Sequence, residues 1–168
     1  MVIPQSNPTH RRAFLTGALS GAAALGARPA IAAALPRARF DRAAYDRYVQ
    51  LMNASDPRVV DFYADDIKFV MNITGKAAVA QFYARHRPFV TESLEVLFFC
   101  SDSTGAAAEV HSTLRCIRDC NDTSVFGRPL RAGETMRTHG FLIYLLNDAG
   151  LIREIKGPPP EVLQDWRP

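Results

Sequence analysis

One predicted strand carries most of the side chains that are suited to acid–base chemistry. Residues 106–120 alternate in polarity, and alternate side chains of a strand point to opposite faces. One face therefore carries Glu109, His111, Thr113 and Arg115. An imidazole exchanges its proton near neutral pH, so His111 is the candidate general base. Glu109 or Arg115 could orient His111 or bind an anionic group of a substrate.

The same alternation permits the opposite arrangement, in which the polar face is exposed to solvent. The side chains that point inward would then be Val110, Leu114 and Cys116. A shift of one residue in the strand register exchanges the two arrangements, so the pattern leaves both open. On the next predicted strand, at 134–146, His139 could pair across to the polar face.

Tyrosines on predicted helices are the second set of candidates. Helical spacing at i, i+3, i+4 and i+7 is occupied by Tyr45, Tyr48, Val49 and Met52. A later helix, which follows Gly75, has an apolar face made of Val79, Phe82, Tyr83 and His86. A buried phenol needs a hydrogen-bond partner, so the tyrosines are the informative members of these faces.

The predicted helices come first along the chain, and the predicted strands follow. Asp56 can cap a short helix that has Pro57 at its first position and ends at residues 64–66. The predicted strands are 67–71, 92–101, 106–120, 134–146 and 151–156. Helix and strand do not alternate, which favours an α+β fold with helices on one face of an antiparallel sheet. The tail at 161–166 could cover the mouth of a pocket.

Several short runs of residues fall within this order of elements. They are Arg47-Tyr48-Val49, Asn53-Ala54, Asp56, Tyr63-Ala64-Asp65-Asp66, Gly75 and Phe82-Tyr83-Ala84. The chain thereby resembles the nuclear-transport-factor-2-like superfamily, which includes ketosteroid isomerases and SnoaL-type polyketide cyclases. The resemblance implies a cone-shaped curved sheet wrapped around the N-terminal helices, a cavity for apolar ligands and a homodimer. It implies substrate-binding residues at Tyr45, Met52, Tyr63, Phe69, Met71, Phe82 and Tyr83, and the polar strand faces add Thr113, Arg115 and His139.

The resemblance also implies catalytic roles, and the chain departs from some of them. Tyr48, Tyr63 and Tyr83 match three tyrosines that form a hydrogen-bond network, in which the tyrosine at the Tyr48 position donates to a substrate oxyanion. The catalytic aspartate of the isomerases falls at Met71, and their second oxyanion donor falls near Leu142. Because an apolar side chain can do neither job, we do not expect ketosteroid isomerase activity. The predicted catalytic residues are Tyr48, His111 and Glu109.

These observations predict a cofactor-independent acid–base enzyme, an isomerase, dehydratase or lyase. Its substrate would be a hydrophobic cyclic or aromatic small molecule. The alternative is a non-catalytic domain of the same fold that binds a small molecule or forms dimers, because one fold hosts many functions. The sequence contains no cofactor motif, and no Cys/His spacing is typical of a zinc site.

The N-terminal residues have the pattern of an export signal. Arg11 and Arg12 form a twin-arginine motif, a Gly/Ala-rich apolar run follows, and Ala30-Ile31-Ala32 is a typical cleavage site. We therefore expect a signal peptide at 1–32, a single domain at 33–168 and a periplasmic or secreted protein. The apolar run is too short for a membrane span, so no stable membrane insertion is expected.

Removal of that segment changes the charge of the chain. It contains three arginines and no acidic residue, so 17 Lys and Arg remain against 17 Asp and Glu. A net charge near zero argues against nucleic-acid binding, which needs a basic face.

The chain has three cysteines, Cys100, Cys116 and Cys120. A disulfide between Cys116 and Cys120 could close a small loop, but burial of all three as small apolar residues is favoured.

Overall fold

The computed structural model describes residues 40–168. The helical segments are α1 (Arg42–Asn53), η1 (Pro57–Phe62), η2 (Val70–Asn72) and α2 (Lys76–His86). The strands are β1 (Tyr63–Phe69), β2 (Ile73–Thr74), β3 (Val90–Ser101), β4 (Gly105–Cys116), β5 (Thr135–Leu146), β6 (Ile152–Lys156) and β7 (Glu161–Arg167). The predicted signal peptide lies outside the described residues. Within 40–168, no helix combines the length and the apolar character needed to cross a membrane.

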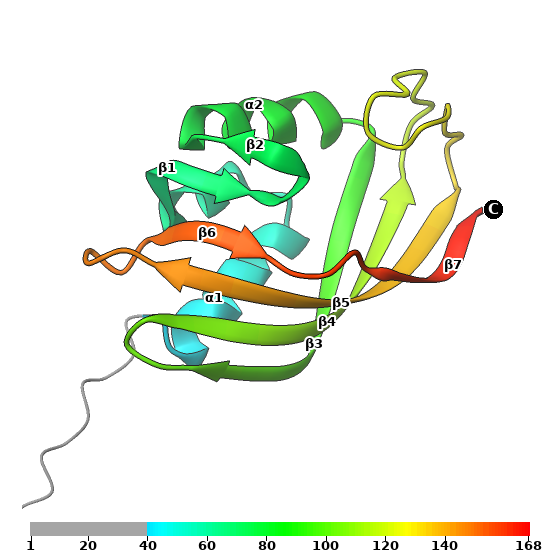
Figure 1. Ribbon diagram of the computed structural model, residues 1–168. Coiled ribbons are helices and arrows are strands. Elements are labelled where there is room, and N and C mark those ends of the chain that lie inside the picture. The colour runs from blue at the N-terminus through cyan, green and yellow to red at the C-terminus, as the bar shows by residue number, and fades with distance from the viewer. Residues whose placement is uncertain (1–39) are drawn as a thin grey trace, which may run out of the picture. The chain divides into compact units, whose positions relative to one another are not determined.

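The strands form one curved sheet in the order β2-β1-β6-β5-β4-β3, and β7 also pairs with β5. Every pair is antiparallel except β1 with β6. Figure 1 shows the long strands β3, β4 and β5 bending, with α1 packed against β3 and α2 packed beside β1. A bulge between Val96 and Phe98 shifts the register of β3 on β4, and bulges bend the strands that contain them. The predicted α+β fold with a curved sheet is confirmed.

Helix α1 forms as its periodicity predicts. Asp41 caps the helix, because its side chain accepts a hydrogen bond from the backbone N–H of Ala44 at 3.0 Å. The buried face consists of Tyr45, Tyr48, Val49 and Met52. At the end of the helix, the Asn53 side chain donates to the Leu94 carbonyl at 3.1 Å and accepts from the Leu94 N–H at 2.7 Å. These two bonds tie α1 to β3.

Several predicted boundaries are wrong, and one of them is the end of the strand predicted at 106–120, which stops at Cys116. Asp56 caps η1 as predicted and accepts from the Arg58 N–H at 2.9 Å. However, β1 begins at Tyr63, where the helix was expected to continue, and it ends at Phe69. Met71, predicted to be the last residue of a strand, has a φ of 62°. That left-handed conformation is incompatible with a strand, so the chain turns there instead.

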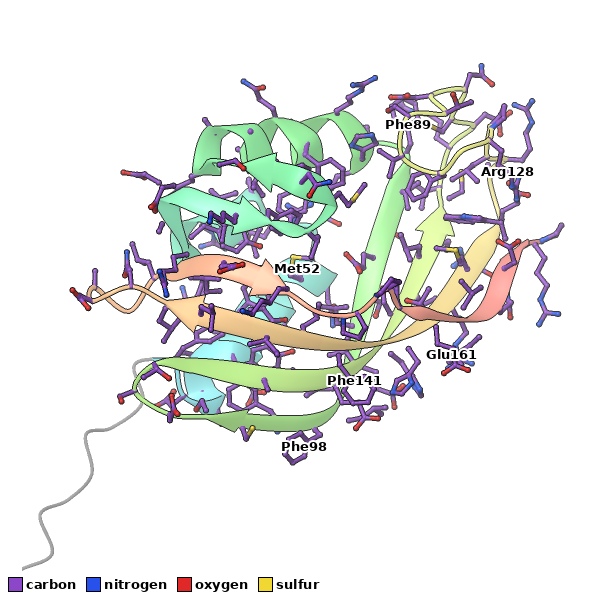
Figure 2. All side chains as sticks on the ribbon, in the orientation of Figure 1. Met52, Phe89, Phe98, Arg128, Phe141 and Glu161 are labelled. Atoms are coloured by element: carbon purple, nitrogen blue, oxygen red, sulfur yellow. The ribbon has the colours of Figure 1, made fainter. Side chains whose placement is uncertain are left out.

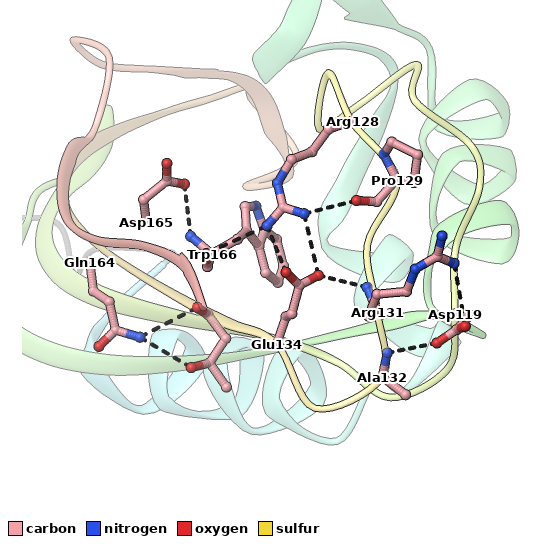
Figure 3. A network of polar contacts seen from close by, with 10 residues as sticks. Asp119, Arg128, Pro129, Arg131, Ala132, Glu134, Gln164, Asp165 and Trp166 are labelled. Carbon is pink, nitrogen blue, oxygen red and sulfur yellow. Dashed lines mark hydrogen bonds and ion pairs between the residues drawn. The ribbon is translucent and has the colours of Figure 1, made fainter. Parts of the chain in front are cut away.

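The C-terminal segment is also more regular than predicted. Residues 161–167 form β7 on the edge of β5 rather than a loose tail. The loop that precedes β5 is fixed by Glu134, whose side chain accepts from Arg128 Nη2 at 2.8 Å and from the Arg131 N–H at 2.6 Å. Figure 3 shows this network beside Trp166 of β7. None of these loop residues lines the cavity described below.

The cysteines are all free. Cys116 and Cys120 are buried and form a second, small core with Val90 and Leu130, as the favoured interpretation of these two residues predicts. Cys100 is exposed, so the expectation that all three are buried is wrong for that residue.

Candidate functional site

A cavity of about 340 Å³ lies between the helices and the curved sheet. Its apolar walls include Met52, Phe69, Val70, Met71, Phe82, Leu94, Val110, Leu114, Met136, Leu142, Ile155, Pro158 and Pro160. Its polar side chains are few: Tyr48, Tyr83, Glu92, Ser112, Thr138 and Tyr144. An apolar cavity with a small number of polar groups is typical of a site for a small organic ligand.

Three tyrosines form a hydrogen-bonded chain along one side of the cavity. The hydroxyls of Tyr48 and Tyr63 lie 3.0 Å apart, and those of Tyr63 and Tyr83 lie 3.1 Å apart. Tyr83 donates onward to Met52 Sδ at 3.6 Å. Tyr48 and Tyr83 line the cavity, whereas Tyr63 lies behind them and joins them. The network implied by the resemblance is therefore present in the structure.

Burial controls the ionisation of these phenols. It raises the pKa of Tyr48 and Tyr63 well above the ordinary value, and it raises the pKa of Tyr83 to about 12. All three hydroxyls therefore keep their protons at neutral pH. A protonated phenol in a dry cavity is a hydrogen-bond donor, which is the form that can stabilise negative charge developing on a ligand oxygen.

Glu92 on β3 brings a carboxyl group into the same cavity. Its Oε1 accepts a hydrogen bond from Ser112 Oγ on β4 at 2.7 Å. Burial raises the pKa of Glu92 above the ordinary value, while Ser112 and the charge of Arg87 act in the opposite direction. A raised pKa moves a carboxyl group toward the pH range in which a general acid–base group works best. Glu92 is therefore the best-placed acid–base group in the cavity.

Sequence reasoning missed Glu92, although a signal was present. Along β3, every second residue points inward, and Val90, Glu92 and Leu94 share that inward face. A carboxylate between two buried apolar residues on one strand face is an expensive placement that needs a partner. That pattern in 90–94 could have identified Glu92 before the structure was known.

The polar face of β4 points away from the cavity. Val110, Ser112 and Leu114 line the cavity, so the alternate side chains lie on the outer side of the sheet. His111 Nδ1 lies 3.5 Å from Glu95 Oε2 there. Five residues that were predicted to line the cavity therefore lie on the outer side of the sheet instead. They are Glu109, His111, Thr113, Arg115 and His139. The physical reason is that the apolar alternate positions are the ones that gain from burial.

The outer side of the sheet has its own polar pairs and exposed aromatic rings. His139 Nε2 lies 2.7 Å from Glu109 Oε1, and its Nδ1 lies 3.6 Å from Glu161 Oε2. Phe98 is 55% exposed and Phe141 is 49% exposed. Figure 2 shows both rings projecting from the strands, whereas Met52 lies in the interior. Within residues 40–168, no cluster of His, Cys, Asp or Glu could hold a metal ion.

The remaining predicted residues divide into two groups. The structure brings six of the predicted residues to the cavity, namely Tyr48, Met52, Phe69, Met71, Phe82 and Tyr83. Two others, Tyr45 and Tyr63, are fully buried in the adjacent core and do not line it. Tyr144 also lines the cavity, and burial raises its pKa well above the ordinary value. Sequence reasoning did not select Tyr144.

Comparison with known proteins gives a fold but no closer relationship. No protein-family model matches the chain, and no curated protein matches its sequence. A protein described as a polyketide cyclase from Pseudomonas putida superposes with a TM-score of 0.59 at 19% identity, over 74% of this chain and 92% of that one.

Two mycobacterial structures are also similar. The Delta 5-3-ketosteroid isomerase from Mycobacterium sp. superposes with a TM-score of 0.54 at 20% identity, over 70% of this chain and 90% of that one. RV0760c from Mycobacterium tuberculosis, in complex with estradiol-17beta-hemisuccinate, gives a TM-score of 0.54 at 20% identity, over 68% and 89% of the two chains. Identities this low show the fold alone. The chain therefore has the cone-shaped α+β fold that polyketide cyclases and ketosteroid isomerases also have.

Proposed function

We propose that the protein is a cofactor-independent acid–base enzyme that acts on a hydrophobic cyclic or aromatic small molecule. The observation that carries this proposal is the position of Glu92, a half-buried carboxyl group with a raised pKa at the wall of an apolar cavity. In the proposal, Glu92 moves the proton and Tyr48 holds the oxyanion that forms when the proton leaves. His111 and Glu109, on the outer side of the sheet, take no part in the reaction.

Glu92 would replace the base that the chain lacks at Met71. The carboxylate removes a proton from a carbon next to a ligand carbonyl, and the electron pair moves onto the carbonyl oxygen to give an enolate. Return of the proton to another carbon completes an isomerisation. Loss of the hydroxyl group of the neighbouring carbon, which takes the proton back from Glu92 and leaves as water, completes a dehydration. In a lyase reaction the carboxylate instead removes the proton of a β-hydroxyl group; a carbonyl forms at that carbon, the carbon–carbon bond breaks, and its electron pair gives the enolate, which then takes up the proton. All three outcomes need the same base and the same oxyanion donor.

The polarity of the tyrosine chain supports the role of Tyr48. When Tyr83 donates to Met52 Sδ at 3.6 Å, Tyr63 can donate to Tyr83 and Tyr48 to Tyr63, which leaves no Tyr48 proton for a ligand. A thioether is a weak acceptor, so little is lost if Tyr83 instead donates to Tyr63 and Tyr63 donates to Tyr48. The Tyr48 proton is then free for a ligand oxygen. A developing enolate would favour this polarity, and each donation would strengthen the next.

The class of substrate follows from the cavity and from the related folds. About 340 Å³ with mostly apolar walls suits a compact ring system. Among the structurally similar proteins, one acts on ketosteroids by name and another was solved with an estradiol ester. These relationships support a cyclic hydrophobic substrate here. Membership of the nuclear-transport-factor-2-like superfamily, and export through the twin-arginine route to the periplasm or the medium, are part of the same proposal.

A panel of cyclic enones, aromatic ketones and β-hydroxyketones tests the proposed function. Glu92→Gln should lower the turnover of any active compound by about a hundredfold or more, since it keeps the shape of the side chain and removes the base. The matched control is Glu95→Gln on the same strand, whose side chain points outward and is exposed. His111→Ala should also leave turnover unchanged. Equal losses for Glu92→Gln and Glu95→Gln would contradict the proposal.

The second candidate is a non-catalytic domain that binds a ligand or forms dimers. The exposed rings of Phe98 and Phe141 on the outer sheet face favour this function, because exposed apolar surface that gathers on one face is typical of a protein–protein interaction site. The two candidates differ in one respect. A binding domain would bind the same ligands without changing them chemically. Glu92→Gln would then change the affinity only, because no product forms.

A further inference from the structure

A second hollow of about 570 Å³ adjoins the cavity. It is formed by the end of β1, η2, β2, the end of β6 and the segment 157–160. The two spaces share wall residues, namely Phe69, Val70, Met71, Ile155, Gly157, Pro158 and Pro160. Because the same residues border both, the outer hollow lies directly against the inner cavity. We call it the vestibule.

The vestibule is positively charged. The chain contains only three lysines, and two of them, Lys68 and Lys156, line the vestibule. The remaining charged residue of the wall is Glu154, which lies next to Lys68 in the register of β1 on β6. None of these three side chains forms an ion pair with another described residue. Two positive charges against one negative charge leave one positive charge available to a ligand.

The rim of the vestibule has a fixed backbone. Met71 and Asn72 have φ values of 62° and 60°, a left-handed conformation that most residues avoid and that persists only where the fold imposes it. This turn places Met71 at the boundary between the two spaces, where its side chain is 53% exposed. The three prolines at 158–160 also line the vestibule and restrict its backbone. A rigid junction of this kind suits a ligand that passes from one space into the other.

We propose that the ligand has two parts, an apolar ring system in the cavity and a carboxylate in the vestibule held by Lys68 and Lys156. This inference rests on the proposed function for the inner part only. A single carboxylate matches the one uncompensated positive charge of the wall. Asn72 and Thr74, which also line the vestibule, supply hydrogen-bonding groups for the carboxylate oxygens. The reacting part of the ligand stays beside Glu92, and the vestibule selects for the charged tail.

Matched ligands separate the two parts. Naphthylbutanoic acid and naphthylbutanol have the same ring and chain length, and they differ only in the terminal charge at pH 7. By titration calorimetry in low salt, the acid should bind about three- to tenfold more tightly than the alcohol, as expected for two partly exposed ion pairs. The preference should shrink in about 0.5 M NaCl because salt screens exposed charges.

Lysine variants then locate the charge. The double variant Lys68→Gln, Lys156→Gln should lose the preference and bind the acid no more tightly than the alcohol, because Glu154 remains, and its affinity for the alcohol should be unchanged. Lys76→Gln, at the third lysine of the chain and outside the vestibule wall, should keep the preference. Glu154→Gln should strengthen binding of the acid, since it removes the only negative charge of the wall.

Three results would overturn the inference. Equal affinities of the wild-type protein for acid and alcohol would remove the charged subsite while leaving the cavity and its proposed chemistry intact. A preference that survives in the double variant would place the carboxylate elsewhere. Failure of both ligands to bind would refute the two-part site and count against the proposed function as well. If the bound acid protects Lys68 and Lys156, but not Lys76, from acetylation by acetic anhydride, that result would support the charged subsite independently of the affinities.

Discussion

Replacement of Ser112 by alanine should change the ionisation of Glu92 without removing it. Ser112 Oγ donates to Glu92 Oε1 at 2.7 Å, and the serine is buried. A hydrogen bond to a charged group contributes about 1.5–3 kcal/mol. One pKa unit corresponds to about 1.4 kcal/mol, so loss of the bond should raise the pKa of Glu92 by about one to two further units.

Carbon-13 NMR of side-chain carboxyl groups measures that change directly. In protein labelled at the glutamate side-chain carboxyl carbon, the Glu92 resonance is assigned by its absence in Glu92→Gln. The titration midpoint of that resonance should move to higher pH in Ser112→Ala. Thr113→Ala is the matched control, because Thr113 is the next residue on β4 and points to the outer face. An unchanged Glu92 titration in Ser112→Ala would refute the assignment of this bond as the main support of the carboxylate.

Three other predictions concern stability, catalysis and assembly. Burial raises the pKa of Glu92 in the folded state, so the folded protein binds a proton more tightly than the unfolded chain does. The stability of the wild-type protein should therefore fall as the pH rises from the unfolded pKa of Glu92 through its folded pKa. The melting temperature of Glu92→Gln should not show this decline. Tyr48→Phe should lower turnover by about a hundredfold; a lower melting temperature with normal turnover would make Tyr48 only a core residue. Gel filtration should show a homodimer, and Phe98→Glu on the outer face should yield a monomer; a wild-type monomer would contradict this assembly.

The sequence predicted most of the elements because local physics determines them. The apolar face of α1 follows from helical spacing, and the cap at Asp56 follows from a side-chain acceptor placed before Pro57. Strand β4 follows from its run of alternating residues, and β3 and β5 lie close to the strands predicted at 92–101 and 134–146. The segment 69–72 was not predictable in this way, because its left-handed turn at Met71 is imposed by neighbouring elements rather than by its own apolar residues.

The candidate site was predictable only in part, for a related reason. Alternation along β4 separates His111 from Ser112, but it does not say which side faces the helices. That choice depends on the curvature of the whole sheet and on what packs against it. The tyrosine network was predicted from a resemblance, and the structure forms it. Glu92 was missed because the polar side chains of β4 form the more conspicuous pattern, whereas Glu92 is a single carboxyl group on a mostly apolar strand face.

The central claim is that Glu92 moves a proton of a ligand bound in the cavity. Exchange of the α-protons of β-tetralone with deuterium from the solvent tests it most directly, since this aromatic cyclic ketone needs only enolisation and no further reaction. Proton NMR should show exchange catalysed by the wild-type protein and by Glu95→Gln, and a loss of about a hundredfold or more in Glu92→Gln. Catalysed exchange that persists in Glu92→Gln, or that is lost equally in Glu95→Gln, would contradict the claim.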